Sequence, residues 1–223
     1  MGDVVCSWSG GKESALALEE TRTSSTHDPV ELLTTVAAHT DRISIHGVRT
    51  ELLERQARRL DLPINVVAIP KGCSGEEYVD LMEAEFAAYR DRGVERLILG
   101  DVFVEDDDDF RGQALDRTGL ETFCPLYGED TGDLIRRFLD AGFAAVTVCV
   151  DGDLGREFVG REVDESFLED LPPDCDPAGE DGEYHTFVYD GPGFETPVSF
   201  ERGEVVEREI ATGSMVYCDL VPT

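Results

Sequence analysis

The sequence contains 223 residues, 41% of them hydrophobic, and its 49 acidic and 19 basic residues give a formal net charge of -30. This apolar content suffices for one large domain or two small ones, and it argues against the disorder that the charge alone would permit. The sequence shows no apolar run long enough to span a membrane and no signal peptide before its first strand, so we expect a cytoplasmic protein without a membrane partner.

The acidic charge favours adaptation to very high salt over disorder. At molar ionic strength the Debye length falls to about 3 Å, which screens the repulsion between surface carboxylates. The charge also disfavours stable binding of nucleic acid, because phosphate binding requires clustered lysine and arginine. The six cysteines include no CxxC pair, so we expect reduced core cysteines rather than a zinc or iron–sulfur site.

In chain order, the first half alternates strand-like and helix-like patterns. The predicted strands cover residues 3–8, 31–39, 64–70 and 94–102, and the predicted helices cover residues 14–22, 49–62 and 74–93. One face of the second helix is formed by Leu52, Leu53, Gln56, Ala57 and Leu60. This alternation predicts an α/β fold with a doubly wound parallel sheet, whose ligands bind beyond the carboxyl ends of the strands.

The second half has a different pattern. A helix is predicted over 130–143 and a strand over 144–150, followed by a loop rich in Pro and Asp. Strand-like runs follow at 184–190, 196–212 and 214–221, with a hairpin turn expected at Gly203. We therefore expect a smaller C-terminal α+β domain, with residues 1–124 forming the nucleotide-binding domain and residues 125–223 the acceptor-substrate domain.

The stretch S-G-G-K-E-S, residues 9–14, joins the first strand to the first helix. Free N–H groups at a helix start bind anions, and two glycines allow close approach of the backbone. Lys12 adds a positive charge in a chain whose one other lysine is Lys71. The loop is not a Walker A motif, since Cys6 and Glu13 break that pattern, and G-x-G-x-x-G is absent. A nucleotide site is therefore favoured over an ordinary glycine-rich turn.

A second group of polar residues lies in G-E-D-G-E-Y-H-T, residues 179–186. Glu180 and Glu183 flank a glycine turn, and His185 shares a face with Glu183 if the strand begins there. Each residue alone fits an ordinary acidic turn of this acidic chain. The whole string is harder to explain in that way, because a β-hairpin needs neither His-Thr nor paired glutamates at its mouth.

S-G-G-K-E-S resembles the pyrophosphate loop of the N-type ATP pyrophosphatases (PP-loop proteins), usually S-G-G-x-D-S, with Glu13 in place of the usual Asp. Together with G-E-D-G-E-Y-H-T, His46, Gly100-Asp101-Val102 and Pro125-Leu126-Tyr127, it makes the chain resemble the diphthine–ammonia ligase family from residue 4 to about 195. The resemblance implies that ATP and ammonium convert diphthine on elongation factor 2 to diphthamide, with AMP and pyrophosphate released.

The resemblance also implies roles for particular residues. The residues expected to bind ATP are Ser9, Gly10, Gly11, Lys12, Glu13, Ser14, His39, His46 and Gly100. The residues expected in catalysis are Lys12, Asp101, Glu180, Glu183 and His185, with Asp101 also the expected Mg²⁺ ligand. Tyr184 is expected to attract the trimethylammonium group of diphthine.

Several departures and alternatives stay open at this point. Ala178 stands where the family often has cysteine, and Cys149 where many members have lysine. An arginine often found after the Gly-Asp pair has Arg111 as its nearest candidate, behind an acidic run at 105–109 that we expect to be a solvated loop. The alternatives are a ligase acting on another carboxylate or on tRNA, and an ATP-binding sensor without catalysis. The oligomeric state, a homo-oligomer included, is open.

The salt hypothesis predicts that folding depends on KCl. Because screening of carboxylate repulsion requires concentrated salt, far-UV circular dichroism is expected to show a gain of structure as KCl rises toward molar concentration. Full folding in dilute buffer, with no further gain from salt, would contradict the hypothesis.

Overall fold

The computed structural model describes residues 2–24, 26–103, 110–210 and 213–223. Its first sheet is parallel, as predicted, with strands in the order β3-β2-β1-β4-β5. The strands are β1 (Gly2–Ser7), β2 (His27–Ala37), β3 (Ile64–Ile69), β4 (Arg96–Ile98) and β5 (Glu121–Phe123). The helices between them are α1 (Lys12–Thr23), α2 (Thr50–Arg59), α3 (Gly75–Asp91) and α4 (Phe110–Thr118).

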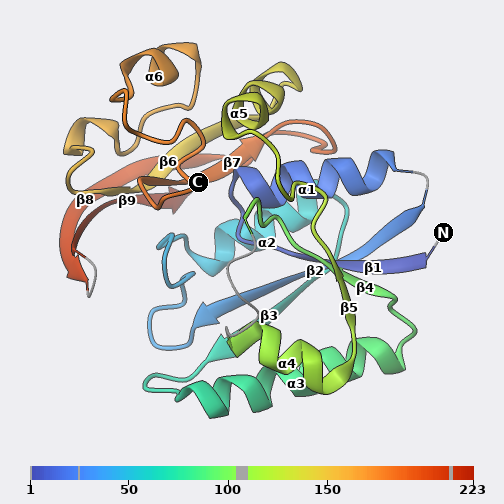
Figure 1. Ribbon diagram of the computed structural model, residues 1–223. Coiled ribbons are helices and arrows are strands. Elements are labelled where there is room, and N and C mark those ends of the chain that lie inside the picture. The colour runs from blue at the N-terminus through green and yellow to red at the C-terminus, as the bar shows by residue number, and fades with distance from the viewer. Residues whose placement is uncertain (1, 25, 104–109, 211–212) are drawn as a thin grey trace.

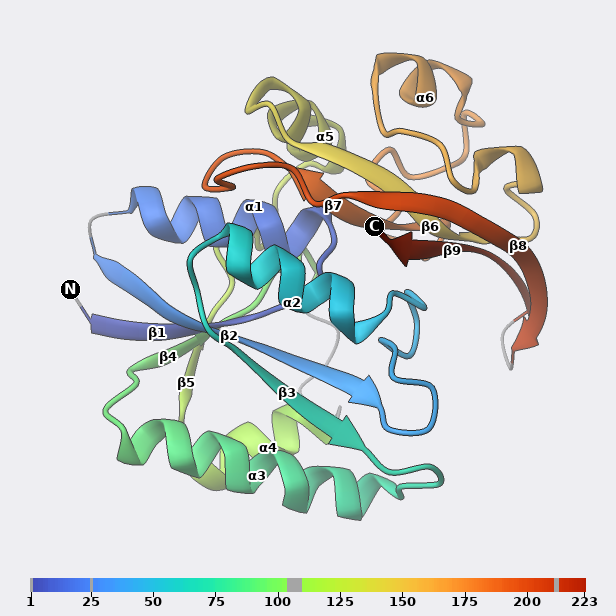
Figure 2. The same ribbon diagram turned by 180° about the vertical axis from the view of Figure 1, so that it is seen from behind.

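Helices cover both faces of this sheet, which confirms the doubly wound arrangement. Figures 1 and 2 show α1 and α2 on one face and α3 and α4 on the other. Side chains of β1 alternate accordingly: Val4 and Cys6 belong to the apolar cluster that includes α1 and α2, whereas Val5 belongs to the cluster that includes α3 and α4. The period of two along each strand therefore divides the first sheet between two cores.

A second, antiparallel sheet has the order β7-β6-β9-β8. Its strands are β6 (Ala144–Asp151), β7 (Tyr184–Asp190), β8 (Phe200–Ile210) and β9 (Gly213–Pro222). The helices of this part of the chain are α5 (Thr131–Asp140), the 3-10 helix η1 (Arg156–Phe158) and α6 (Glu165–Asp170). In both ribbon views this sheet lies over α1 and α2, with α5 and α6 on its outer side (Figures 1 and 2). The smaller α+β part is thus present, and α1 and α2 are enclosed between two sheets.

One apolar cluster continues from the first sheet into the second. It joins Val4 of β1 and Leu53 of α2 with Val148 of β6 and Phe138 of α5. A division at residue 125 therefore stays a prediction, because the two parts share a core.

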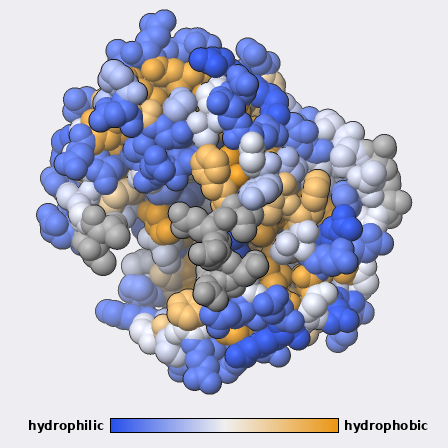
Figure 3. All heavy atoms as spheres, in the orientation of Figure 1, coloured by the Kyte–Doolittle hydropathy of each residue, from blue (hydrophilic) through white to orange (hydrophobic). Residues whose placement is uncertain are grey.

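Hydrophilic side chains occupy most of the face seen in Figure 3, as the net charge of -30 requires. No described helix is long and apolar enough to cross a membrane.

The prediction of a hairpin turn at Gly203 is wrong. Strand β8 continues through Gly203 to Ile210, and it pairs with β9 as far as Gly213. The pairing register shifts between Arg202 and Val205, which marks a β-bulge. A Cβ atom at Gly203 would lie 3.1 Å from Val221 Cγ2, so the glycine permits a close approach at the bulge rather than a reversal of the chain.

The sequence analysis also missed α4, β5, η1 and α6. Strand β5 is three residues long and its side chains are exposed, so it lacks an apolar pattern. Helix α4 buries only Ala114, Leu115 and Thr118, which is a weak periodic signal. The expected solvated loop over the acidic run 105–109 lies outside the described residues.

Charged side chains join the two sheets at one edge. Asp219 of β9 accepts hydrogen bonds from Arg42 Nη1 at 2.8 Å, and from Arg49 Nε at 3.1 Å and Nη2 at 2.5 Å. Burial raises the pKa of Asp219, but the hydrogen bonds from Arg49 and Arg42 outweigh this effect and hold that pKa below its ordinary value of 3.8. The pair of arginines therefore ties the chain that enters α2 to the second sheet.

We expect Asp219→Asn to lower the free energy of unfolding by about 1 to 3 kcal/mol, because it leaves two partly buried guanidinium groups without their carboxylate. The effect should be full at neutral pH and should shrink as the pH falls from 3.8 through the lower pKa of the folded state, below which the carboxylate of the folded parent protein is itself protonated. Urea unfolding measures both. Asp133→Asn, which breaks an exposed pair with Arg136, is the control and should have almost no effect. Equal losses in the two variants would contradict the interpretation.

Candidate active site

A cavity of about 420 Å³ opens at the carboxyl ends of β1 and β4, where the start of α1 meets the loop before β7. The predicted site residues that line it are Ser9, Lys12, Glu13, Ser14, His46, Gly100, Asp101, Glu180 and His185. Residues from both halves of the sequence therefore meet in one cleft. The position agrees with the general rule that ligands of doubly wound sheets bind beyond the strand ends.

The glycine loop presents hydroxyl and N–H groups together. Gly11 N–H donates to Ser9 Oγ at 3.2 Å, Ser14 Oγ donates to the Gly11 carbonyl at 2.9 Å, and the two serine Oγ atoms lie 3.2 Å apart. Gly10 has φ +76°, and a Cβ there would lie 2.7 Å from Leu53 Cδ2. Both the backbone conformation and the close packing thus require glycine at this position.

Strand β7 of the second sheet supports the glycine loop. Val188 N–H donates to the Gly10 carbonyl at 2.9 Å, and Lys12 N–H donates to Thr186 Oγ1 at 3.0 Å. A Cβ at Gly11 would lie 3.2 Å from the Thr186 carbonyl oxygen. The conformation of the glycine loop therefore depends on strand β7, whose Thr186 lies 174 residues after Lys12 in the sequence.

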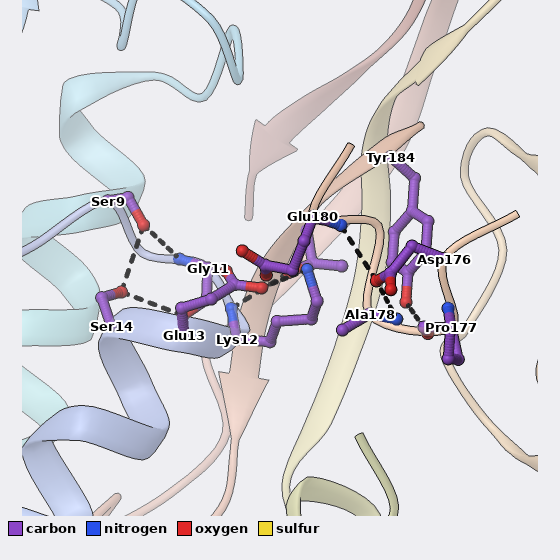
Figure 4. Close-up of polar contacts among 11 residues, drawn as sticks. Ser9, Gly11, Lys12, Glu13, Ser14, Asp176, Pro177, Ala178, Glu180 and Tyr184 are labelled. Atoms are coloured by element: carbon purple, nitrogen blue, oxygen red, sulfur yellow. Dashed lines mark hydrogen bonds and ion pairs between the residues drawn. The ribbon is translucent and has the colours of Figure 1, made fainter. Parts of the chain in front are cut away.

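Lys12 is buried rather than mobile at the surface, since only 2% of the residue is exposed. Its Nζ forms an ion pair with Glu13 and lies 4.7 Å from the centroid of the Tyr184 ring. Figure 4 shows Lys12 and Glu13 extending from the start of α1 toward Glu180. Glu13, in place of the usual Asp, thus links Lys12 to the acidic segment before β7.

Glu180 belongs to the same cluster of charges. Burial and the neighbouring Glu13 carboxylate raise the pKa of Glu180 to about 8, while Lys12 acts in the opposite direction. The two carboxyl groups also share a hydrogen bond, so near neutral pH one proton lies between them. The backbone that carries Glu180 is fixed by Asp176, whose Oδ1 accepts from Ala178 N–H at 2.9 Å and from Glu180 N–H at 3.1 Å (Figure 4).

Asp101 lines the cleft just after β4. Its carboxylate forms an ion pair with Arg111 of α4, which also lines the cleft. Gly100 brings the backbone against α1, because a Cβ there would lie 2.9 Å from the Glu13 carbonyl carbon. Among the described residues no group of three or more His, Cys, Asp or Glu side chains could hold a metal by itself. Mg²⁺ often takes one or two carboxylates plus phosphates, and Asp101 fits that kind of site.

Two histidines close the cleft between the two sheets. The rings of His46 and His185 are stacked, with centroids 4.6 Å apart and an interplanar angle of 21°. Burial lowers the pKa of His46 to about 4, and burial also lowers the pKa of His185 well below its ordinary value, with the nearby charges of His46 and Lys12 adding to the effect. Both rings are therefore neutral at physiological pH, and their stacking weakens as acid protonates them.

The side chains of three residues that were expected at the site do not line the cleft. His39 is exposed at the end of β2 and does not line the cleft. Glu183 Oε1 accepts from Asp176 N–H at 2.7 Å, so Glu183 holds the loop before β7 instead of facing the cleft. Tyr184 is fully buried, its hydroxyl donates to the Pro177 carbonyl, and Lys12 lies over its ring. The expectation that Tyr184 attracts a trimethylammonium group does not fit this packing.

The sequence analysis missed the roles of two polar residues. Asp176 holds the loop before β7, and Gln56 contacts the glycine loop. Asp176 was one acid among many in a Pro- and Asp-rich loop, and no local signal distinguished it. Gln56 carried a signal that could have been used, because it was the one polar residue on the apolar face of its predicted helix. A polar side chain in such a position needs buried hydrogen-bond partners.

A second cavity of about 160 Å³ adjoins the cleft and shares Ser7, Ser9 and Arg111 with it. Its walls are mainly apolar side chains and backbone of β1, β2 and α3, among them Trp8, Met82 and Phe86. The combination of this partly apolar cavity with an adjoining loop of N–H and hydroxyl donors can accommodate a ring system linked to a chain of phosphates.

Two family models match the chain. The model of the diphthamide synthase N-terminal domain matches residues 2–122, and that of the diphthamide synthase C-terminal domain matches residues 130–216. Together they include every cleft-lining residue named above. No protein of curated function matches the sequence.

The proton held by Glu180 predicts a distinct pH dependence of stability. Because the folded pKa of about 8 lies above the ordinary value of 4.5, the folded state binds the extra proton, and stability is lost as the pH rises from the lower to the higher value. Glu180→Gln keeps a hydrogen-bond donor toward Glu13 and should not show this loss. Thermal unfolding across the two pKa values measures it, with Asp181→Asn, an exposed neighbouring carboxylate, as the control. Parallel curves for the Glu180→Gln and parent proteins would contradict the assignment.

Proposed function

Because the chain belongs to the diphthamide synthase family, we propose that it is the ligase that amidates diphthine on elongation factor 2. A role in diphthamide biosynthesis and the use of ATP follow from the family and its loop. The proposed reaction consumes ATP and ammonium and releases AMP and pyrophosphate. The observation that carries the proposal is the meeting of S-G-G-K-E-S and G-E-D-G-E in one cleft.

In the proposed complex, the adenine ring of ATP occupies the second cavity, beside Met82 and Phe86. The β- and γ-phosphates then reach the N–H of Gly11 and the hydroxyls of Ser9 and Ser14, at the start of α1. Positive partial charge at a helix N-terminus favours this placement. The α-phosphate lies in the cleft that Glu180 and Asp101 both line.

Adenylation is needed because a carboxylate is a poor acyl donor. A diphthine carboxylate oxygen attacks the α-phosphorus, the bond to the bridging oxygen breaks, and pyrophosphate leaves with the electron pair. Ammonia then attacks the acyl carbon, AMP leaves, and the nitrogen loses a proton to form the amide. Positioning of the reactants and stabilisation of the leaving phosphates supply most of the rate.

Asp101 and Arg111 suit the charge changes on phosphate. Arg111 is a guanidinium donor already held at the cleft by Asp101, and such a fork matches phosphate oxygens. Asp101 would hold Mg²⁺, whose chemistry is to neutralise the charge of ATP phosphates. The residues present fit that ion as part of an ATP complex rather than as a site formed by protein ligands alone.

Glu180 is our candidate for the base that converts ammonium to ammonia. With a pKa of about 8, Glu180 accepts a proton only in its ionised form, which predominates above pH 8, and that form is a stronger proton acceptor than an ordinary glutamate. Contacts with Glu13 and with the Tyr184 ring hold Lys12 beside Glu180. In this proposal the Lys12 ammonium group lies between the ATP phosphates and the acceptor carboxylate of diphthine. Glu183 and His185 support this wall from the loop before β7 and from β7 itself.

We further propose that the protein works in the cytoplasm at high salt, without a stable nucleic-acid complex. The assay therefore uses molar KCl, with ATP, ammonium and elongation factor 2 that carries diphthine. AMP formation and the mass change from acid to amide on the modified histidine are both measured. AMP without the mass change would indicate a ligase for another carboxylate or for tRNA, and ATP binding without AMP would indicate a sensor.

In this assay Lys12→Ala is expected to reduce AMP formation by about 100-fold or more, because it removes the buried cation beside the phosphates. Glu183→Gln should leave ATP binding unchanged, since Glu183 does not line the cleft. Lys71→Ala, which removes the other, exposed lysine, is the matched control and should retain full activity. Normal amidation by Lys12→Ala would refute the role of Lys12.

A further inference from the structure

Gln56 is a polar residue in the middle of the apolar core. It lies on α2 between the two sheets and is 0% exposed. Its Oε1 accepts from Trp8 Nε1 at 2.9 Å, and its Nε2 donates to the carbonyl oxygens of Gly10 at 3.0 Å and Val188 at 2.6 Å. Because an indole N–H can only donate, Trp8 determines that the amide oxygen faces β1 and that the NH₂ group faces the glycine loop.

The Gly10 carbonyl therefore accepts two hydrogen bonds, from Gln56 and from Val188 N–H. The peptide between Gly10 and Gly11 is planar and trans, so its N–H points away from its carbonyl oxygen. Holding the oxygen against Gln56 and β7 thus directs the Gly11 N–H to the opposite side, where it donates to Oγ of Ser9, a residue that lines the cleft.

This peptide would otherwise reorient easily. Two successive glycines lack the Cβ atoms that restrict the backbone of other residues. A reversed peptide would present the negative end of a carbonyl to an incoming phosphate and withdraw the N–H donor. The Gln56 side chain, which comes from α2, opposes this reversal together with Val188 N–H.

We infer that Gln56 is a positioning residue for phosphate binding, which holds the peptide between Gly10 and Gly11 with its N–H facing the cleft. The inference rests on the proposed use of this loop for the β- and γ-phosphates. Gln56 also joins the loop to Val188, so the same side chain makes the phosphate site depend on the packing of β7 against α2.

The test compares the binding of ATP, inorganic pyrophosphate and AMP to the full chain by calorimetry. Gln56→Met keeps the length and burial of the side chain but cannot form the three hydrogen bonds. We expect it to weaken binding of pyrophosphate and ATP about tenfold or more and to change binding of AMP little. Unchanged affinity for pyrophosphate, or equal weakening of pyrophosphate and AMP, would overturn the inference.

Leu52→Ala is the matched control, because Leu52 is equally buried on α2. It should lower the unfolding temperature, and it should leave the ratio of pyrophosphate affinity to AMP affinity as in the parent protein. If the parent protein binds neither ATP nor pyrophosphate, the proposed function fails with the inference. If the parent binds both and Gln56→Met binds them equally well, only the inference fails.

A second variant gives a signature that loss of stability would not produce. In Gln56→Glu, burial should raise the pKa of the new carboxyl. The protonated form can still donate to a carbonyl oxygen, whereas the ionised form would repel the oxygens of Gly10 and Val188. Relative to the parent, its pyrophosphate affinity should therefore fall as the pH rises through neutrality, while that of Gln56→Met stays constant. A constant ratio for both variants would overturn the inference.

Discussion

The hydrogen bonds between the glycine loop and strand β7 are the constraint on which the rest of the site depends. Gly10 carbonyl accepts from Val188 N–H, and Lys12 N–H donates to Thr186 Oγ1. They form only because the second sheet lies directly on α1 and α2 (Figures 1 and 2). A loop of the first sheet would otherwise leave polar backbone groups unpaired in a buried place, which is costly. The two parts of the chain therefore line one cleft and share one core.

Electrostatics explain how such an acidic protein keeps a buried lysine. Lys12 has an ion pair with Glu13 and the face of the Tyr184 ring, and these contacts replace part of its hydration. The cost appears on Glu180, whose pKa is raised to about 8 by burial and by the neighbouring Glu13 carboxylate. A lysine and two glutamates thus form a compact cluster at the point where phosphate and acceptor would meet.

The sequence predicted long amphipathic elements well and short or irregular ones poorly. Helix α3, predicted over residues 74–93, extends over Gly75–Asp91 and begins with a capping box of Ser74 and Glu77, a local pattern of residues three positions apart. Strand β5 and helix α4 were missed, since a three-residue exposed strand has no period to detect. Gly203 was assigned to a turn because glycine permits both turns and bulges, and only the pairing of β8 with β9 distinguishes them.

By itself, the sequence determined the parallel α/β sheet, the family and the nucleotide loop, because periodicity and short motifs are local properties of the chain. Only the tertiary structure decided which of the expected side chains meet. It placed His46 and Glu180 in the cleft but left His39 at the surface and turned Glu183 toward Asp176. It also assigned Gln56 to the loop, through bonds that span 46 and 132 residues of sequence. Such contacts depend on how the two sheets pack against α2, and no local pattern of residues can predict contacts between segments that lie so far apart in the sequence.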